Sequence, residues 1–396
     1  MRTRHVAAAM AAVLSTLGVA GCSDSNDNKN EAVTKVDFIG MAAPSTVDQK
    51  ADIYSEARAV YTFESGRTEE YPLQYHKIFD TTTTLGGNVV GGLYSAFGPL
   101  TDNDGQMASD APDGTSLMMI SGLSVPGATG NPLAMVTQFE YKSLPPNDGT
   151  STGEFWSKLP AAMGLALLDQ DAKSGMLAAR SYTNIGMSGV QGGWIFCGST
   201  LSPWNTHVSS EEYEPDAKVR GGGAKAADSD DGTDINSFSK YQFNNAATAN
   251  PYHYGLVPEV TVDASGKATV VKHYAPGRFA REMQIGASDN RTFIGGDDGK
   301  ATGLFMFVAD REKDLSAGTI YAAKVTQTAA TGAGSYTLQW IRLGQATDAE
   351  IKTMVDSGIK FSDIFDASNT DPGDATYKKV VTYNGTEWLR LKSGMD

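Results

Sequence analysis

The residues best suited to metal chemistry lie close together in one segment, residues 194–216, which reads WIFCGSTLSPWNTHVSSEEYEPD. Cys197 follows an apolar run, and Glu211 and Glu212 come after a Ser-Pro-Trp-Asn-Thr turn. A thiolate together with carboxylates suits a transition metal, and carboxylates alone suit calcium. The spacing matches no zinc motif. The segment is therefore a candidate metal site, and a buried cysteine beside a solvated acidic loop is the open alternative.

Two later segments carry charged side chains with similar potential. Arg278 and Glu282 could flank an oxyanion and a metal respectively, although a surface ion pair is the more common role of such residues. Asp297 and Asp298 lie in the sequence GGDDG, where paired carboxylates beside flexible glycines could bind a hard cation. The same sequence is also typical of an ordinary hairpin turn.

Several familiar catalytic motifs are absent from the chain. It has no Gly-x-Ser-x-Gly, no GxxxxGK[ST], no GxGxxG and no HExxH, and its five histidines are scattered. The sequence therefore argues against a zinc hydrolase built on histidine ligands.

The net charge limits the choice of partners. The formal charge is −14, so nucleic acid and anionic membranes are repelled, and neither is an expected partner. A phosphate-bearing substrate is repelled as well, and an enzyme acting on one needs local cations, most simply bound metals.

The expected elements are mostly short strands. Forty-three glycines concentrate between strand-like runs, which favours an all-β fold with many turns. Four strands are expected near residues 291–294, 303–310, 319–327 and 335–344, with the tight connections of a β-propeller blade. Helices are expected at residues 154–168, 171–180 and 348–356. Residues 221–237 are expected to form a long surface insertion.

The N-terminus has the layout of an export signal. Residues 1–21 carry Arg2 and Arg4, then an uncharged apolar run that ends in Val-Ala-Gly before Cys22. This junction resembles the lipobox of bacterial lipoproteins, so Cys22 is the expected lipidation site and a lipid anchor in the cell envelope the expected location. Residues 22–45 are expected to form a flexible tether before a domain over residues 46–396, which leaves Cys197 without a disulfide partner.

Taken together, these segments resemble the PhoX family of exported bacterial alkaline phosphatases. The longest resembling stretch is residues 197–212, where a cysteine is followed by Pro-Trp-Asn-Thr and a pair of glutamates. Shorter stretches keep the family order along residues 70–390: Tyr71 to His76, Pro112-Asp113, Thr137 to Glu140, Tyr254-Gly255, Gly277-Arg278-Phe279 with Glu282, and Gly296-Asp297-Asp298 with Gly303-Leu304-Phe305.

The resemblance implies a β-propeller, six-bladed in the family, that holds iron and calcium and hydrolyses small phosphate esters. By position it implies that Cys197 ligates iron, and that Glu282, Asp297 or Asp298, and Glu212 alone or together with Glu211 complete the metal shell. Arg278 is the candidate catalytic residue beside the phosphate. A non-enzymatic surface lipoprotein that uses the propeller as a binding module is the alternative.

Three departures from the family pattern stand out. Arg281 precedes Glu282 where many members carry histidine, and Ser209 stands where some have a second cysteine. Family members also continue beyond the point that corresponds to Asp396, so an incomplete propeller of low activity is expected for this chain.

Overall fold

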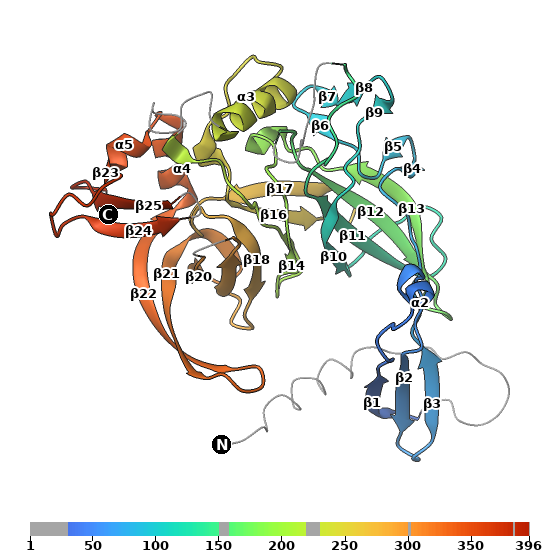
Figure 1. Cartoon of the computed structure of the whole chain (residues 1–396). Helices are drawn as coiled ribbons and strands as arrows, with labels where there is room; N and C mark the ends of the chain where they lie inside the picture. Colours follow the sequence, from blue (N-terminus) through green and yellow to red (C-terminus); the bar gives the residue numbers. More distant parts are fainter. Residues whose placement is uncertain (1–30, 150–157, 219–229, 300–301, 383–384, 396) are drawn as a thin grey trace. The chain divides into compact units, whose positions relative to one another are not determined.

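The computed structural model describes residues 31–149, 158–218, 230–299, 302–382 and 385–395 (Figure 1). The chain divides into two compact units. The first holds the described residues up to Ile78 and two short segments, 129–131 and 170–178, and the second holds the remainder from Phe79 onward. Among the described residues, no helix is long and apolar enough to span a bilayer.

The first unit contains a small antiparallel sheet with β2 in the middle. Its elements are β1 (Val33–Ile39), α2 (Val47–Ala51), β2 (Arg58–Phe63) and β3 (Thr68–Pro72). The helix begins at Thr46, whose side chain accepts a hydrogen bond from the Gln49 amide while the Gln49 side chain accepts one from Thr46. Ordered structure is thus present from Val33, within the range predicted as a tether. Cys22 and the predicted export signal lie outside the described residues.

The second unit is dominated by four antiparallel sheets, each built from strands that follow one another in sequence. The first sheet contains β10 (Pro112–Met118), β11 (Asn131–Phe139), β12 (Ala162–Gln170) and β13 (Leu177–Asn184), and the second contains β14 (Thr200–Leu201), β15 (His207–Val208), β16 (Val257–Val262) and β17 (Ala268–His273). The third contains β18 (Arg281–Gly286), β19 (Thr292–Asp297), β20 (Leu304–Arg311), β21 (Asp314–Ala329) and β22 (Ser335–Thr347). The fourth contains, in spatial order, β23 (Phe365–Ser368), β25 (Gly385–Leu391) and β24 (Lys378–Thr382).

Smaller elements fill the connections. Three two-stranded hairpins are formed by β4 (Thr84–Leu85) with β5 (Asn88–Val89), β6 (Tyr94–Ser95) with β7 (Gly98–Pro99), and β8 (Thr101–Asp102) with β9 (Gly105–Gln106). The helices are α3 (Asp230–Phe243), α4 (Asp348–Asp356), α5 (Phe361–Ile364) and two 3₁₀ turns, Ser188–Val190 and Pro251–His253. The predicted all-β class is confirmed.

The hydrophobic core lies between successive sheets. One buried cluster joins residues of β10, β11 and β12 to Val260 and Val262 of β16. A second cluster joins Val208 and Val257 to Phe293 and Phe307 of the next sheet. The first sheet therefore packs against the second, and the second against the third. Among the described residues the sheets do not close into a ring, so the expected six-bladed propeller is not seen there as a closed fold.

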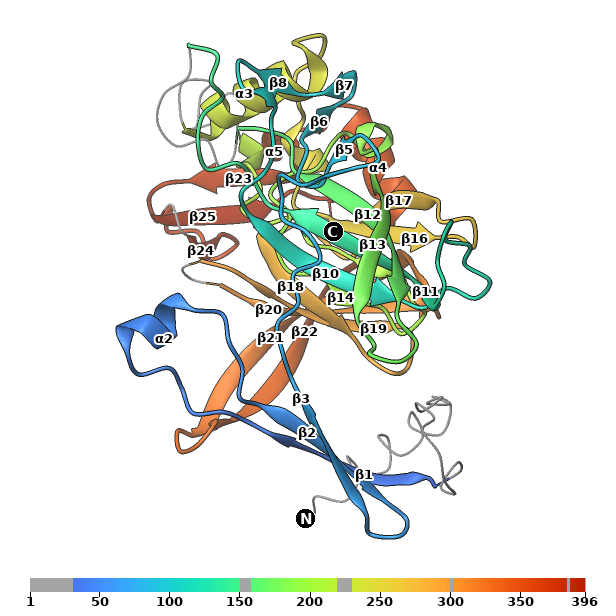
Figure 2. The ribbon, with the colours of Figure 1, turned by 90° about the vertical axis from the view of Figure 1, so that its right-hand side faces the viewer.

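The first strands of three sheets lie side by side. Strand β14 contacts both β10 and β18. Figure 1 shows it between them, and Figure 2 shows the three strands close together from another side. Glycines permit this approach: a Cβ on Gly114 of β10 would lie 2.5 Å from the backbone nitrogen of Ser199, and one on Gly198 would lie 3.1 Å from the Glu282 carbonyl oxygen. The ends of these strands carry the candidate site.

Two of the three predicted helices are wrong. Residues 162–168 belong to strand β12, and residues 177–180 begin strand β13. Almost every side chain from Ala161 to Leu168 is buried, so this strand is apolar on both faces and lacks the period of two that marks a half-exposed strand. The third prediction is confirmed: α4 begins after Thr347, whose side chain and that of Glu350 form a capping box.

The four predicted strands near residues 291–343 are confirmed as β19 to β22, although β19 runs through Gly296 to Asp297. A hairpin turn over the whole GGDDG sequence is therefore wrong. Of the predicted insertion at residues 221–237, residues 221–229 lie outside the described residues and the rest form the start of α3.

Candidate metal centre

Cys197 is shared by two groups of potential metal ligands. Its sulfur and one carboxylate oxygen each of Asp113 and Glu140 lie within 4.8 Å of one another. The same holds for the sulfur with oxygens of Glu212 and Glu282. A single buried thiol thus belongs to two groups, each of which adds a pair of carboxylates.

Each of these ligands is positioned by the start or end of a strand. Asp113 is the second residue of β10, Glu140 follows the last residue of β11, and Glu282 is the second residue of β18. Cys197 comes just before β14, and Glu212 follows directly after Glu211, which forms an isolated bridge with Phe196. Three successive sheets therefore contribute ligands at the point where their first strands meet.

Buried polar side chains fix the backbone around Cys197. Gln138 donates a hydrogen bond from Nε2 to the Cys197 carbonyl, and its Oε1 lies 2.9 Å from Nε2 of His207. The other ring nitrogen of His207 lies 2.9 Å from the Ser116 hydroxyl. Burial lowers the pKa of His207 to about 3, so the imidazole is neutral and acts as a hydrogen-bonding bridge.

Further contacts tie β18 to the same loop. The amide of Gly198 donates to the Glu282 carbonyl at 3.0 Å. The Ser210 hydroxyl lies 2.7 Å from the Gly198 carbonyl oxygen and 2.9 Å from that of Glu282. These contacts hold the backbone of Cys197 and Glu282 in a fixed relation.

The electrostatics of the group favour a cation. Burial, with the charges of Asp113 and Glu282, raises the pKa of Glu140 to about 7. Burial and a hydrogen bond with Asp298 raise the pKa of Glu212 to about 8. The pKa of Cys197 is also raised, first by burial and then by the four surrounding carboxylates. A positive ion would relieve this repulsion and favour the thiolate, so the donor set fits a metal.

Asp297 and Asp298 lie at the border of this group. Asp298 accepts a hydrogen bond from the Tyr213 hydroxyl and shares another with Glu212. Asp297 ends β19 and pairs in register with Arg281, and burial raises its pKa. The structure therefore connects Asp298 to the centre through Glu212 and places Asp297 beside Arg281.

Glu211 is engaged elsewhere. Its carboxylate is fully buried, lies 2.8 Å from the Lys272 ammonium and accepts hydrogen bonds from the Trp194 and Leu256 amides. Because neighbouring side chains point to opposite sides of an extended chain, Glu211 and Glu212 face different surroundings. The Glu211 carboxylate is therefore occupied by Lys272 and two backbone amides, whereas Glu212 lies in the group around Cys197.

Arg278, the predicted phosphate-binding residue, also has other partners. Its guanidinium donates to the carbonyls of Pro251 and Pro215 and lies 4.0 Å from a Glu214 oxygen. The neighbouring Arg281 is buried and donates to Gln284 and to two backbone carbonyls. The described contacts of both arginines therefore hold neighbouring backbone and side chains in place.

Asp113 and Glu140 were not among the ligands expected from the sequence, although both lie in stretches that resemble the family. A usable pattern was present. In the hairpin of β10 and β11, Pro112 pairs with Phe139, so the residue after each of them lies at the same end of the hairpin. Recognising the two strands as a hairpin would have placed the two carboxylates together.

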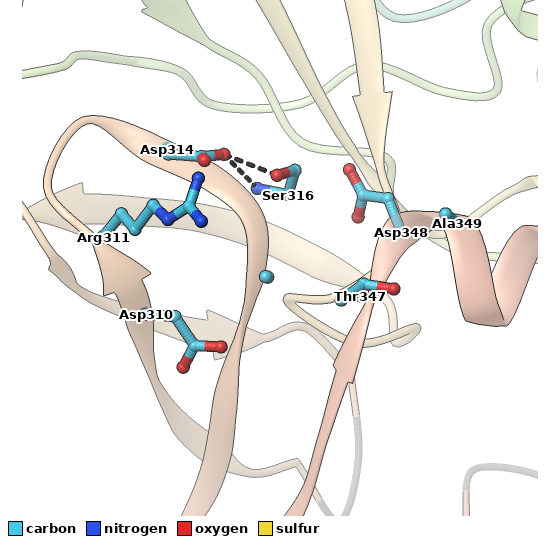
Figure 3. A pocket seen from close by; sticks show the side chains of 8 residues that line it. Asp310, Arg311, Asp314, Ser316, Thr347, Asp348 and Ala349 are labelled. Carbon is cyan, nitrogen blue, oxygen red and sulfur yellow. Dashed lines mark hydrogen bonds between the residues drawn. The ribbon is translucent and has the colours of Figure 1, made fainter.

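A separate pocket of about 530 Å³ lies where β20, β21 and β22 meet the start of α4 (Figure 3). Its acidic side chains already have partners: Asp310 accepts from Gln345, Asp314 from Ser316, and Asp348 from the amides of Tyr274 and Ala275. None of the potential metal ligands described above lines this pocket, and its polar groups serve turns and a helix cap.

The described sheets bring together a thiol and four carboxylates, a donor set that fits a cation. The family described as alkaline phosphatase PhoX matches residues 173–380, just over half of the chain. The chain belongs to this family of phosphatases. Neither the curated proteins nor the solved structures contain a significant match.

Proposed function

We propose that this protein hydrolyses phosphate esters of small molecules at a metal centre formed by Cys197, Glu212, Glu282, Asp113 and Glu140. The observation that carries the proposal is the sharing of one buried thiol by two pairs of carboxylates, within a chain of the PhoX family. The alternative is a non-enzymatic binding protein, which would not need such a centre.

The donor types suggest which metals bind. A thiolate favours a transition metal such as iron, and carboxylates favour calcium. We infer that Cys197 and Glu212, which are buried, hold iron, and that the exposed Asp113 and Glu282 contribute to calcium sites nearer the solvent. Bound cations there would neutralise charge on the phosphate oxygens.

The remaining chemistry belongs to the chain itself. The five donors repel a phosphate dianion when they carry their own charge, so the ester can approach only when that charge is balanced. Asp113 and Glu282 lie at the solvent side and set the direction of approach. Gln138 and His207 keep the Cys197 backbone in place beneath them.

The architecture supports a propeller around this centre. The first three sheets pack one on the next, and their first strands are neighbours, as the inner strands of propeller blades are. We propose that the sheets are blades with the ligands at the inner edge. An experimental structure with the sheets arranged around the centre is the expected result, and two sheets stacked as a sandwich would contradict it.

The place of action is proposed from the N-terminus. Residues 1–21 with Cys22 suggest an exported protein with a lipid anchor in the cell envelope. Calcium is abundant outside the cytoplasm in most habitats, which suits the carboxylate donors.

The test measures metal content and activity together. In Cys197→Ser, bound iron should be lost and hydrolysis of a generic aryl phosphate should fall by about a hundredfold or more, because loss of a direct ligand exceeds the 10–100-fold effect of an outer-shell partner. Cys22→Ser is the matched control, since it removes the other cysteine and should keep the iron.

Carboxylates are tested in the same way. Glu282→Gln keeps the shape of the side chain and should lower calcium content and activity, whereas Glu312→Gln on the exposed turn between β20 and β21 should change neither. Normal folding with equal iron in Cys197→Ser and the parent would refute the ligand role. A well-folded protein that purifies without metal and without chelator-sensitive activity would favour the binding alternative.

A further inference from the structure

Strands β21 and β22 continue as a two-stranded ribbon beyond the rest of their sheet. Strand β20 pairs with β21 only as far as Ala322, whereas β22 pairs with β21 out to Ala329. We define the distal ribbon as residues 323–340, the part of this hairpin that has no third strand (Figure 1).

The distal ribbon has one apolar and one polar face. Residues directly opposite in an antiparallel pair point to the same side. Val325 pairs with Leu338 and Ala323 pairs with Trp340 on one side. Tyr336 lies on the same side, where its partner Gln327 is the one polar residue among these three pairs. The opposite side carries the pairs Lys324–Gln339 and Thr326–Thr337.

The apolar face is open to solvent. Val325 is 49% exposed, Leu338 41% and Tyr336 56%. Strands of ordinary antiparallel sheets turn such a face to the core, so a ribbon that exposes it is available for contact with an apolar surface.

The charge of this hairpin differs from that of the chain. Between Leu315 and Thr347 there is no Asp or Glu, and the charged residues are Lys324 and Arg342, although the whole chain has a net charge of −14. No charge interrupts residues 325–341, and one basic residue flanks this stretch on each strand. The pattern complements the anionic phosphates of lipid headgroups around an apolar interior.

We propose that the apolar face of the distal ribbon adsorbs to the surface of a lipid bilayer. Its open strand edges carry unpaired backbone groups, which cannot enter the hydrocarbon region, so the ribbon lies along the headgroup boundary. Tyr336 and Trp340 suit that boundary, where aromatic side chains are enriched. Arg342, two residues from Trp340 on the same face, meets the phosphates, whereas Lys324 lies on the polar face that is turned to the water. The acidic remainder of the protein stays in the aqueous phase.

A second copy of the chain is the less favoured occupant. A stable protein interface takes about 20–30 residues on each side, and the apolar face offers only Ala323, Val325, Tyr336, Leu338 and Trp340. The lipid proposed on Cys22 would also hold the ribbon close to a membrane, although adsorption of the ribbon does not depend on that lipid.

The first experiment compares the two faces. In the full chain with Cys22→Ser, a single exposed cysteine is introduced by Leu338→Cys on the apolar face or by Gln339→Cys on the polar face, while the buried Cys197 stays unlabelled. Each protein carries an environment-sensitive fluorophore and is mixed with vesicles of phosphatidylethanolamine and phosphatidylglycerol. A blue shift at position 338 without one at position 339 is expected.

The second experiment measures binding without a label. Val325→Ser should lower the vesicle partition coefficient about tenfold, because the loss of a buried valine corresponds to roughly one decade in a binding constant. Thr326→Ser, one residue away on the polar face, should leave it unchanged. Equal responses at positions 338 and 339, no vesicle binding, or a Val325→Ser effect on self-association alone would each overturn the proposal.

Discussion

Lys272 is the residue whose removal should disturb the fold most, although it lies outside the metal centre. Its ammonium is 2.8 Å from Glu211, 2.9 Å from the Gly192 carbonyl oxygen and 3.1 Å from that of His253. Both Lys272 and Glu211 are buried, which raises the pKa of Glu211 and lowers that of Lys272. Three donors to the carboxylate and three acceptors around the ammonium nevertheless favour the charged pair.

Lys272→Met keeps the length of the side chain and removes its charge. Glu211 then remains as a buried carboxylate without a counter-charge, and breaking such a pair typically costs about 3–5 kcal/mol. That is a large share of a typical unfolding free energy of about 5–15 kcal/mol. Because Glu211 bridges Phe196, next to Cys197, the variant should also lose metal at temperatures where the parent retains it.

Urea unfolding followed by tryptophan fluorescence measures the effect. The double variant Lys272→Met with Glu211→Gln removes both charges and should recover about 2 kcal/mol, since Gln can still accept one backbone hydrogen bond. Lys267→Met, on the exposed turn of the same hairpin, is the control and should stay within about 0.5 kcal/mol of the parent. A loss below about 1 kcal/mol in Lys272→Met, or no recovery in the double variant, would show that the pair is not what stabilises this region.

Three further outcomes are expected. Cys22→Ser should abolish acyl labelling and release the protein from membrane fractions treated at high salt; continued acylation would contradict the lipobox. Burial lowers the pKa of His273, but its hydrogen bonds to Asp348 and Glu259 outweigh burial and raise the pKa from its ordinary 6.5 to about 9. The protonated imidazole should therefore contribute about 3 kcal/mol of stability below pH 6.5, and this contribution should be lost as the pH rises through about 9. The difference in unfolding free energy between the parent and His273→Gln, followed across that window, should shrink with rising pH, and a constant difference would refute the assignment. Gly114→Ala should destabilise the fold by about 1–3 kcal/mol, because its Cβ would lie 2.5 Å from the Ser199 nitrogen, while Gly344→Ala, which meets nothing within 4 Å, should be nearly neutral in thermal unfolding.

The fold class could be predicted because strands and turns leave a clear local pattern. The runs between residues 291 and 343 alternate and are separated by turn residues, and they form β19 to β22. The failure at residues 162–168 has a physical cause. An apolar run that is buried on both faces has the composition of a buried helix as well as of a strand, and only the neighbouring sheets decide between them.

The candidate site was predictable in part for a similar reason. Cys197 and Glu212 come from one segment whose residue types already indicated a metal. Glu282 was a candidate ligand in a separate segment, and the family resemblance assigned it to the same metal shell. Asp113 and Glu140 come from another sheet, and no local pattern reports that β10 lies beside β14. A period of two would have separated Glu211 from Glu212 once the segment was taken as extended.

The building of each large sheet from one continuous stretch of sequence has a consequence for how this molecule can change over evolutionary time. A stretch that contains a whole sheet can be duplicated or deleted without breaking a hydrogen-bonded ladder in the sheets on either side. Such an event changes only which sheet faces pack against each other and which first strands become neighbours. Because Asp113, Cys197 and Glu282 lie in or next to the first strands of three different sheets, gaining or losing one sheet would change how many donors converge while leaving the position of each remaining donor on its own strand intact.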